Sequence, residues 1–569
     1  MIDRSAFRGT ASVMARWCLT AVALAAAAVG CSAGEIGGSS SGPGPTPTGG
    51  NTGNNNNNNP PPPANFVAEQ GGLRRLTIPE LRNAVSDLFG ANMTLTTQFE
   101  PDTALSGFAS IGAARVQLSA SFVEQLEAAS MDVSGRVMSD TAGRAALVGC
   151  MPAGTTDDAC TSQFLKKFGR RVWRRPLTDA EVTRYVGVAN NAQTTVADFY
   201  QGLRYAIAGL LQSPNFIYRM EIGANPAANG QLAFDDYQLA TRLSFFLWNS
   251  IPDDTLLDAA DAHQLTKSGG LMTQAQRLLA SPRAANAMQT FFTELYRLSD
   301  LDNLPQLDTI FPQVKSGTLG ASMRDETLKF LNDLAFTRKG DFRDIYSANT
   351  TFVNAEMAKL YGLPSPTTGT TSMPVTLPAA SLRTGLLGQA SFLAGNSQPN
   401  RSSPTKRGKF IREMMLCSPV PAAPPDVPKF PEDAPGTTRQ RLTQHRTDPY
   451  CKSCHEAMDP IGLGLENFDG IGAFRTAEAG QPIDASGTLD GVDFSGPVQL
   501  GTALRNHPNS ANCLAMNMYR YAVGHVETPG ETPAITALEK AFSDNGFHFQ
   551  SLLEGVVNSP GFVYAAKPQ

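Results

Sequence analysis

Residues 77–90, TIPELRNAVSDLFG, show the pattern that recurs along this chain and indicates its fold. Thr77 and Glu80 have the Thr-x-x-Glu spacing of a capping box, in which each side chain binds a backbone N–H at a helix start. Apolar side chains then follow at helical spacing: Leu81, Val85, Leu88 and Phe89. Gly90 suits the helix end because glycine readily adopts the left-handed conformation. The stretch therefore predicts one amphipathic helix with both ends capped.

Similar signals predict further helices downstream. We expect a helix over residues 164–175 that ends at Pro176, because the residue before a proline is driven out of the α region. Two more pairs have capping-box spacing and open further helices: Thr178 with Glu181, and Ser250 with Asp253. Strand-like sequence is scarce, and the best candidate is a short β-hairpin near residues 483–494 that turns at Asp490-Gly491. The chain is therefore predicted to be mainly α.

A helix-ending pattern occurs three times, at residues 210–214, 278–282 and 556–560, and each copy closes on Ser-Pro. The first and last copies continue as Pro-x-Phe-x-Tyr, as far as Tyr218 and Tyr564. The serine before each proline is a natural helix end. Either the chain reuses one helix stop or a helical unit has been duplicated, and the sequence leaves both interpretations open.

The chain has 569 residues, of which 41% are hydrophobic and 17% are charged, with a formal net charge of −5. This length predicts several domains, and the composition is that of a globular protein. We expect no nucleic-acid partner, because neither the net charge nor a Lys/Arg stripe supplies the basic surface that one needs. Arg-rich patches at residues 73–76, 170–175 and 407–412 are interpreted as solvated faces or structural ion pairs rather than an anion-binding site.

Residues 1–31 have the layout of a secretory signal peptide. Arginines precede an apolar run over residues 18–29, and small residues lead to Gly30-Cys31. The Gly-Cys ending resembles the lipobox of bacterial lipoproteins, which would make Cys31 the lipidated first residue of the mature chain. An ordinary signal peptide cleaved nearby is the alternative. Residues 32–66 are rich in Ser, Gly, Pro, Thr and Asn, so we expect a disordered tether between the membrane anchor and the folded body.

Residues 451–455, CKSCH, carry the strongest chemical signal, because Cys-x-x-Cys-His is the attachment motif of covalent haem c. The thiols of Cys451 and Cys454, three residues apart on one helical turn, can each form a thioether to a porphyrin vinyl group. His455 then projects its imidazole towards the haem iron from the same side. Attachment takes place on exported chains, in agreement with the signal peptide. A redox-active Cys451–Cys454 disulfide and a zinc site are the alternatives.

Several residues are candidates for the sixth iron ligand, opposite His455. Met458 lies on the same helical face as His455 and cannot reach the opposite side of the iron. We favour Met516 or Met518, because enough chain separates them from the motif to fold over the far face. Three histidines are alternatives: His445, His507 and His525. A vacant position would instead favour peroxide or oxygen chemistry over pure electron transfer.

Four cysteines remain once Cys31, the haem pair and the signal-peptide cysteine are set aside, an even number that suits an oxidising compartment. Cys150 and Cys160 bracket a short polar loop, so a disulfide between them is geometrically easy. Cys417 would then pair with Cys513. Four cysteines allow three pairings, however, and the sequence does not choose among them.

Acidic residues and turn formers follow the motif. Asp459-Pro460 and Gly462 predict a turn, after which a short helix follows. Glu466 and Asp469 are three residues apart on one helical face, a spacing that a general acid could use. We favour helix capping or an ion pair with Arg475 for these carboxylates.

At this point the chain resembles a known family. Residues 451–469, Cys-x-x-Cys-His-x-x-Met-Asp-Pro-x-Gly-x-x-x-Glu-x-x-Asp, are similar to the cytochrome-c-like segment of large exported bacterial proteins, typical of planctomycetes. These proteins consist of consecutive domains of unknown function, the series DUF1587, DUF1595, DUF1592, DUF1588 and DUF1585. Further matches occur in the family's order, at residues 74–76, 174–178, 242–249, 403–408 and 520–524. The resemblance implies export and a haem-type motif, and some members are joined to carbohydrate-binding modules. No catalytic mechanism transfers, and Asn396 stands where relatives often have His.

Taken together, these signals divide the chain into seven segments. They are a lipoprotein signal peptide (1–31), a tether (32–66), an N-terminal helical module (67–140), a helical module with Cys150 and Cys160 (141–225), a central helical module (226–375), a cytochrome-c-like module (376–480) and a C-terminal helical module (481–569). The fold prediction is thus a multi-module helical body with a small cytochrome-c-like haem segment.

The functional hypothesis is an exported c-type haem protein, lipid-anchored to a bacterial membrane at the periplasm or cell surface. It would act in electron transfer or in haem-dependent oxidation of an extracellular substrate, such as a polysaccharide. The redox partner protein and the catalytic residues are not identified by the sequence. The alternative hypothesis is a cell-surface binding or scaffold lipoprotein whose haem is structural or absent.

Overall fold

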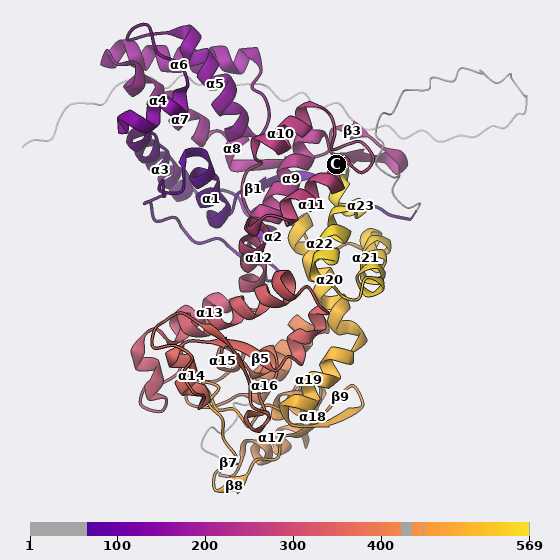
Figure 1. The fold of residues 1–569 in the computed structure, drawn as a ribbon. Helices are drawn as coiled ribbons and strands as arrows, with labels where there is room; N and C mark the ends of the chain where they lie inside the picture. The colour runs from indigo at the N-terminus through magenta and orange to yellow at the C-terminus, as the bar shows by residue number, and fades with distance from the viewer. Residues whose placement is uncertain (1–64, 423–434, 448, 568–569) are drawn as a thin grey trace, which may run out of the picture. The chain divides into compact units, whose positions relative to one another are not determined.

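The computed structural model describes residues 65–422, 435–447 and 449–567, and in these residues the chain is mainly α-helical, as the sequence predicts (Figure 1). Strands in this part of the chain pair antiparallel in sheets of two or three strands. The predicted signal peptide, Cys31 and nearly all of the predicted tether lie outside the described residues. No helix in the described ranges is both long and apolar enough to cross a membrane.

The elements of the first part of the described chain are β1 (Gly72–Arg75), α1 (Ile78–Phe89), α2 (Ala109–Arg115), α3 (Ala120–Ser139), α4 (Thr141–Val148), α5 (Asp158–Trp173), α6 (Asp179–Val196) and α7 (Phe199–Gln212). Figure 1 shows the helices of the first helical body, α1 and α3 to α7, gathered together. α2 does not belong to this body, because Ile111 on it packs in the core of the later helices. Both predicted capping boxes are present, at Thr77 and Thr178, and Gly90 ends α1 with a φ of 101°. The predicted 164–175 helix corresponds to α5, which begins earlier because the side chain of Asp157 caps it. It also ends two residues earlier than predicted, at Trp173, because Arg174 has a left-handed conformation with a φ of 59°.

The central body contains α9 (Asp236–Trp248), whose C-terminal end is rich in aromatic residues. Its remaining elements are β3 (Asn225–Pro226), β4 (Gln231–Ala233), α10 (Asp254–Asp261), α11 (Gly270–Leu279), α12 (Pro282–Leu295), α13 (Leu319–Asn332), β5 (Thr350–Val353), α14 (Ala355–Tyr361) and β6 (Met373–Thr376). The helix start predicted at Ser250 is wrong. The side chain of Asp253 caps α10, whereas Ser250 Oγ donates to Asp87 Oδ2 at 2.6 Å, so a tertiary contact takes the hydroxyl away from the helix.

Two of the Ser-Pro repeats form the same local structure. After α7, Ser213 ends one helix and caps the next, α8 (Pro214–Ile217), which runs into β2 (Tyr218–Glu221). The last copy has the same order: α22 (Phe549–Val557), α23 (Pro560–Val563) and β11 (Tyr564–Ala566). β2 pairs with β1, and β11 pairs with β4. The serine is therefore a helix end, as predicted, and also the start of the following helix.

The rest of the chain contains the predicted hairpin, the motif helix α18 and the C-terminal helices. Its elements are α15 (Ala390–Gly395), α16 (Pro404–Phe410), the π-helix η8 (Ile411–Met415), α17 (Thr438–Thr447), α18 (Pro449–Leu463), β7 (Ala477–Glu478), β8 (Gln481–Pro482), β9 (Ser486–Leu489), β10 (Val492–Ser495), α19 (Gly496–Asn506), α20 (Pro508–Val523) and α21 (Thr532–Asp544). β9 and β10 form the hairpin predicted near 483–494. Its turn residues Asp490 and Gly491 have φ of 48° and 86°.

The structure contains the two disulfides that the sequence analysis favours. Cys150 pairs with Cys160, which closes a loop before α5. Cys417 pairs with Cys513, so the chain after η8 is tied to α20. The second bond links the stretch just before the motif helix to the C-terminal helices.

Three arginines from the Arg-rich patches are buried. The prediction that the patches are solvated faces is therefore wrong for them. Arg74, Arg174 and Arg407 are 5%, 3% and 0% exposed. Each donates to backbone carbonyl oxygens of segments far along the chain. A guanidinium has five N–H donors in a fixed fork, which suits the collection of several carbonyl groups at one place. The same patches also supply ion pairs, as predicted, for example Arg170 with Asp258.

Candidate functional site

The Cys-x-x-Cys-His motif lies in the first half of α18. The sequence analysis predicts a turn at Asp459-Pro460, but α18 continues through Pro460 to Leu463. The helix is held by an unusually close approach to α16. A Cβ atom on Gly408 would lie 1.9 Å from the carbonyl oxygen of Met458, and one on Gly462 would lie 1.9 Å from that of Pro404. Because both contacts are with backbone, these glycines let the two helices approach and fix the position of the motif.

The imidazole of His455 is oriented by a buried carboxylate. Its Nδ1 lies 2.9 Å from Oδ2 of Asp459, one helical turn later, and donates a hydrogen bond to it as N–H. Asp459 is 0% exposed, and its Oδ1 accepts a hydrogen bond of 2.7 Å from the hydroxyl of Thr405 on α16. Histidines that ligate metals commonly donate their second ring N–H to a carboxylate, which fixes the tautomer and the ring orientation. Nε2 is then the nitrogen that would face a metal.

A cavity of about 240 Å³ adjoins His455. Its lining is mainly basic, hydroxyl and amide side chains: Gln398, Arg401, Ser402, Ser403, Pro404, Thr405, Lys406, Thr438, Arg441, Leu442 and His455. The cavity is smaller than the roughly 300–1,000 Å³ of pockets that enclose a drug-sized ligand. The cationic side chains suit carboxylate groups such as the propionates of a haem.

The two motif cysteines, Cys451 and Cys454, are partly exposed and take no part in the two disulfides. Cys454 Sγ lies 3.9 Å from the carbonyl oxygen of Pro421, just before residues 423–434, which are outside the described residues. Within the described ranges, no group of three or more His, Cys, Asp or Glu side chains is placed to hold a metal ion. A haem site needs no such group, because haem iron takes one or two protein ligands.

The candidates for the sixth ligand lie elsewhere. Met518 is fully buried in the hydrophobic core, and Met516 packs beside it on α20, with its Sδ 3.6 Å from Nη2 of Arg520. His507 contacts Asp490, and His525 contacts Glu531. The side chain of His445 is outside the described residues. None of the described candidates lines the cavity at His455.

The carboxylates after the motif have structural partners, as the sequence analysis favours. Glu466, which is buried, receives hydrogen bonds from Arg475 and Ser402 and lies 3.6 Å from Arg407. Asp469 accepts backbone N–H groups of the following turn. These contacts fasten the C-terminal end of α18 to α16 and assign neither residue to proton transfer. Asn396 donates to the carbonyl of Phe392 within α15, and it does not line the cavity either.

A larger cleft of about 600 Å³ lies between α1 and α12. Several hydroxyl and amide side chains line it: Asn83, Ser86, Asn249, Asn286, Gln289, Thr290, Thr293 and Ser299. Burial raises the pKa of Glu294, which also lines the cleft, to about 8, so its carboxyl group is protonated at neutral pH. Asp87 on α1 pairs with Arg283 on α12, so this ion pair joins the two helices at the cleft. No local motif marks these residues, so the sequence analysis missed the cleft.

Five family models match the chain. They are described as Protein of unknown function and cover residues 74–139 (DUF1587), 160–221 (DUF1595), 234–363 (DUF1592), 383–478 (DUF1588) and 490–562 (DUF1585). These are the domains, in the same order, that the sequence resemblance predicts. The DUF1588 match, which carries the printed name PSCyt3, contains the Cys-x-x-Cys-His motif. No curated protein and no solved structure matches the chain.

Proposed function

The chain belongs to the family of proteins built from this series of five domains of unknown function, and on that premise we propose that it is an exported, lipid-anchored c-type haem protein. The name PSCyt3 of the domain that contains the motif supports a cytochrome-like role for this segment. The observation that carries the proposal is the hydrogen bond that His455, the last residue of Cys-x-x-Cys-His, donates to the buried carboxylate of Asp459.

The donor set fits a covalent haem. Cys451 and Cys454 are on one turn of α18 and are partly exposed, as two thiols must be to react with vinyl groups. Asp459 holds the ring of His455, and Thr405 holds Asp459, so the proximal ligand is oriented before any metal binds. A bound haem would supply one-electron redox chemistry at its iron. The basic side chains at the neighbouring cavity would bind its propionates.

The helical body supports a role beyond simple electron transfer. Its cleft between α1 and α12 offers hydroxyl and amide groups, which suit a polar extracellular substrate such as a saccharide. Glu294 is protonated at neutral pH, so its carboxyl group could donate a hydrogen bond to an oxygen of such a substrate. A haem held by Cys451, Cys454 and His455 would supply one-electron redox chemistry, so oxidation of a substrate in this cleft would need a redox partner protein as the final electron acceptor and would release its protons to solvent.

Export and the lipid anchor at Cys31 rest on the sequence pattern. Two disulfides within the described ranges support an oxidising compartment, because disulfides persist mainly outside the cytosol. The anchored protein would face the periplasm or the cell surface, and the tether would separate the body from the membrane.

The test is haem attachment in the full chain, coexpressed with the haem-attachment machinery. A pyridine haemochrome spectrum of the wild-type protein should show one thioether-linked haem per chain. The Cys451→Ala, Cys454→Ala variant should show none. Ser453→Ala, which changes one of the two residues between the cysteines, should bind haem normally. Mass spectrometry that finds no haem mass on the wild-type motif peptide would overturn the proposal.

A second variant tests the role of the buried carboxylate. Asp459→Asn keeps the shape of the side chain but removes the charge that orients His455, so redox activity should fall about 10–100-fold. The reduction potential should shift with it, whereas thioether attachment should persist. Glu456→Gln is the matched control, because Glu456 is an exposed carboxylate on the same helix that pairs with Lys452. Equal redox behaviour of the two variants would contradict the role of Asp459.

The alternative is a binding or scaffold lipoprotein. Its haem would be structural or absent. The cleft between α1 and α12 would then bind a partner without catalysing a reaction. His455→Ala distinguishes the two functions: it should abolish redox activity if the main proposal holds and leave ligand binding intact if the alternative does.

A further inference from the structure

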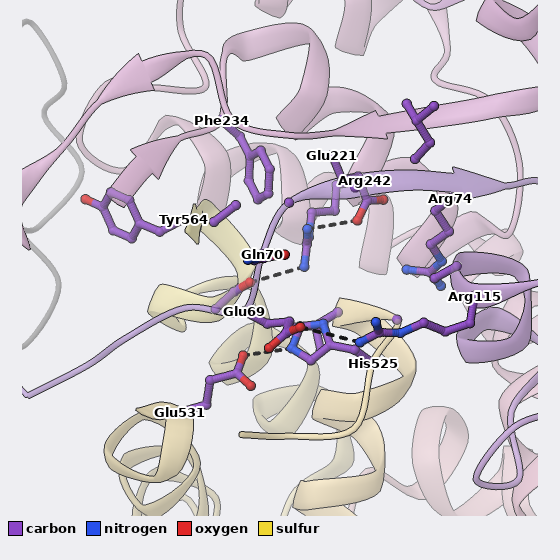
Figure 2. A pocket seen from close by; sticks show the side chains of 18 residues that line it. Glu69, Gln70, Arg74, Arg115, Glu221, Phe234, Arg242, His525, Glu531 and Tyr564 are labelled. Atoms are coloured by element: carbon purple, nitrogen blue, oxygen red, sulfur yellow. Dashed lines mark hydrogen bonds and ion pairs between the residues drawn. The ribbon is translucent and has the colours of Figure 1, made fainter. Parts of the chain in front are cut away.

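A second cavity, partly open to solvent, lies where segments from both ends of the described chain meet (Figure 2). This cavity, of about 160 Å³, is lined from β1, the end of β2, α9, the turn after α20 and the chain around β11. Its residues come from four of the five matched family segments, for example Arg74, Glu221, Arg242 and His525. No single segment could form it.

Each carboxylate at the cavity already has a cationic or hydrogen-bonding partner. Figure 2 shows Glu69 with Arg115, at 3.4 Å, and Glu531 with His525, at 2.9 Å. Glu221 pairs with Arg242 at 2.9 Å. The three acidic groups are therefore committed to protein partners, and their charge is largely balanced before any ligand enters.

Arg74 is the exception among the charged lining residues. It is 5% exposed, and in the described part of the chain it has no carboxylate within ion-pair distance. Its Nη1 and Nη2 donate to the neutral carbonyl oxygens of Ala522 and Tyr521, at 3.2 and 3.3 Å. Its Nε finds no acceptor among the described residues, and the same holds for Nε of Arg242 across the cavity. Glu221 and Glu80 act on Arg74 from beyond ion-pair distance, and they do not offset its burial and the like charges of Arg219 and Arg242. A bound anion would supply the direct counter-charge that Arg74 lacks.

Gly524 leaves the space that the guanidinium of Arg74 occupies. A Cβ atom on Gly524 would lie 2.6 Å from Nη1 of Arg74, so a larger residue there would displace the guanidinium. Gly524 also has a φ of 79°, which favours glycine. Burial and the charge of Arg219 lower the pKa of Arg74 to about 10, so the group remains charged at neutral pH.

We propose that this cavity is a binding site for a small monocarboxylate, whose carboxylate group pairs with Arg74. Its volume limits the ligand to a few non-hydrogen atoms beyond the carboxylate. A monoanion is favoured over a phosphate dianion, because Arg74 offers a single positive charge without an ion pair, and one carboxylate group balances it. The inference is independent of haem, since the motif helix contributes no residue to this cavity.

The experiment uses the full-length chain and two probes, sodium formate and sodium acetate, in calorimetric titration and thermal unfolding. Sodium chloride at equal ionic strength and inorganic phosphate are the comparison salts. The carboxylates should bind saturably and raise the unfolding temperature more than either comparison salt does. Arg74→Gln should weaken carboxylate binding roughly tenfold or more, since a charge-assisted hydrogen bond is lost.

Further variants keep the test decisive if Arg74→Gln does not fold. Ala114→Leu adds side-chain volume at a residue of α2 that lines the cavity, and it should abolish the carboxylate response while the protein stays folded. Arg184→Gln is the matched control, because Arg184 is an exposed arginine on α6 that does not line the cavity. The proposal is overturned if carboxylates act no differently from chloride, which would leave water as the occupant. It is also overturned if Ala114→Leu binds as the wild type does.

Discussion

Replacement of Glu294 by Gln should make the protein less sensitive to alkaline pH. Glu294 lines the cleft between α1 and α12 and accepts a hydrogen bond of 3.3 Å from the backbone N–H of Ala109. Burial raises its pKa from 4.5 to about 8 in the folded protein. Gln has the shape of the protonated acid and can accept the same hydrogen bond, so the substitution removes the titration and keeps the contact.

The sign follows from proton linkage. Between pH 4.5 and 8 the folded state binds more protons at Glu294 than the unfolded state does, so this group's contribution to stability is complete below pH 4.5 and falls as the pH rises through 8. A difference of about 3.5 in pKa corresponds to about 5 kcal/mol over the whole range. Between pH 6 and pH 8 the wild type should lose about 2 kcal/mol of unfolding free energy that the Glu294→Gln variant keeps.

Urea unfolding followed by helical circular dichroism at pH 6, 7 and 8 measures this difference. Other buried acids, such as Glu326, whose pKa burial raises to about 7, titrate in both proteins and cancel in the comparison. Glu124→Gln, the same chemical change at an exposed position on α3, is the control and should follow the wild type. If the wild-type and Glu294→Gln curves fall in parallel with pH, the carboxyl group is not protonated in the folded protein, and its proposed role at the cleft fails.

Two further predictions concern how the motif helix is held. Gly462→Ala would place a Cβ atom 1.9 Å from the carbonyl oxygen of Pro404 and should destabilise the protein by about 1–3 kcal/mol in urea unfolding, whereas Gly187→Ala, on a helix surface with open space, should be neutral or slightly stabilising. Loss of the Cys417–Cys513 disulfide, which closes a loop of 96 residues, should cost about 4–5 kcal/mol, and an unchanged urea midpoint in the double Cys→Ser variant would contradict this.

Local sequence was sufficient to predict those elements whose backbone groups are capped by residues nearby in the sequence. The capping boxes at Thr77 and Thr178 and the Asp490-Gly491 turn were predicted because each needs only residues within one turn of itself. The predictions at Ser250 and Pro460 were wrong because a distant partner decides both. Asp87 binds the Ser250 hydroxyl, and the packing of α16 against α18 stabilises a helix that continues past Pro460.

In the candidate site too, only the part that is local in the sequence could be predicted. Cys-x-x-Cys-His is a local motif, so its three residues could be identified from the sequence, whereas the orientation of His455 could not be. Thr405, which holds Asp459, lies on another helix, and only the fold brings them together. The cleft with Glu294 and the cavity with Arg74 have no local pattern at all, because each is assembled from segments that are distant along the chain.

Buried arginines join several of the five family segments to one another. Arg74, from the first matched segment, donates to the carbonyl oxygens of Tyr521 and Ala522 in the last, and Arg242, from the third, donates to that of Gly561, also in the last. A buried guanidinium that loses such acceptors retains its charge and its desolvation penalty. Neither the first nor the third segment can therefore keep its arginine satisfied without the last. The motif arginines by which the family is recognised thus join its segments into one folding unit, and the cavity at Arg74 exists only in that assembled unit.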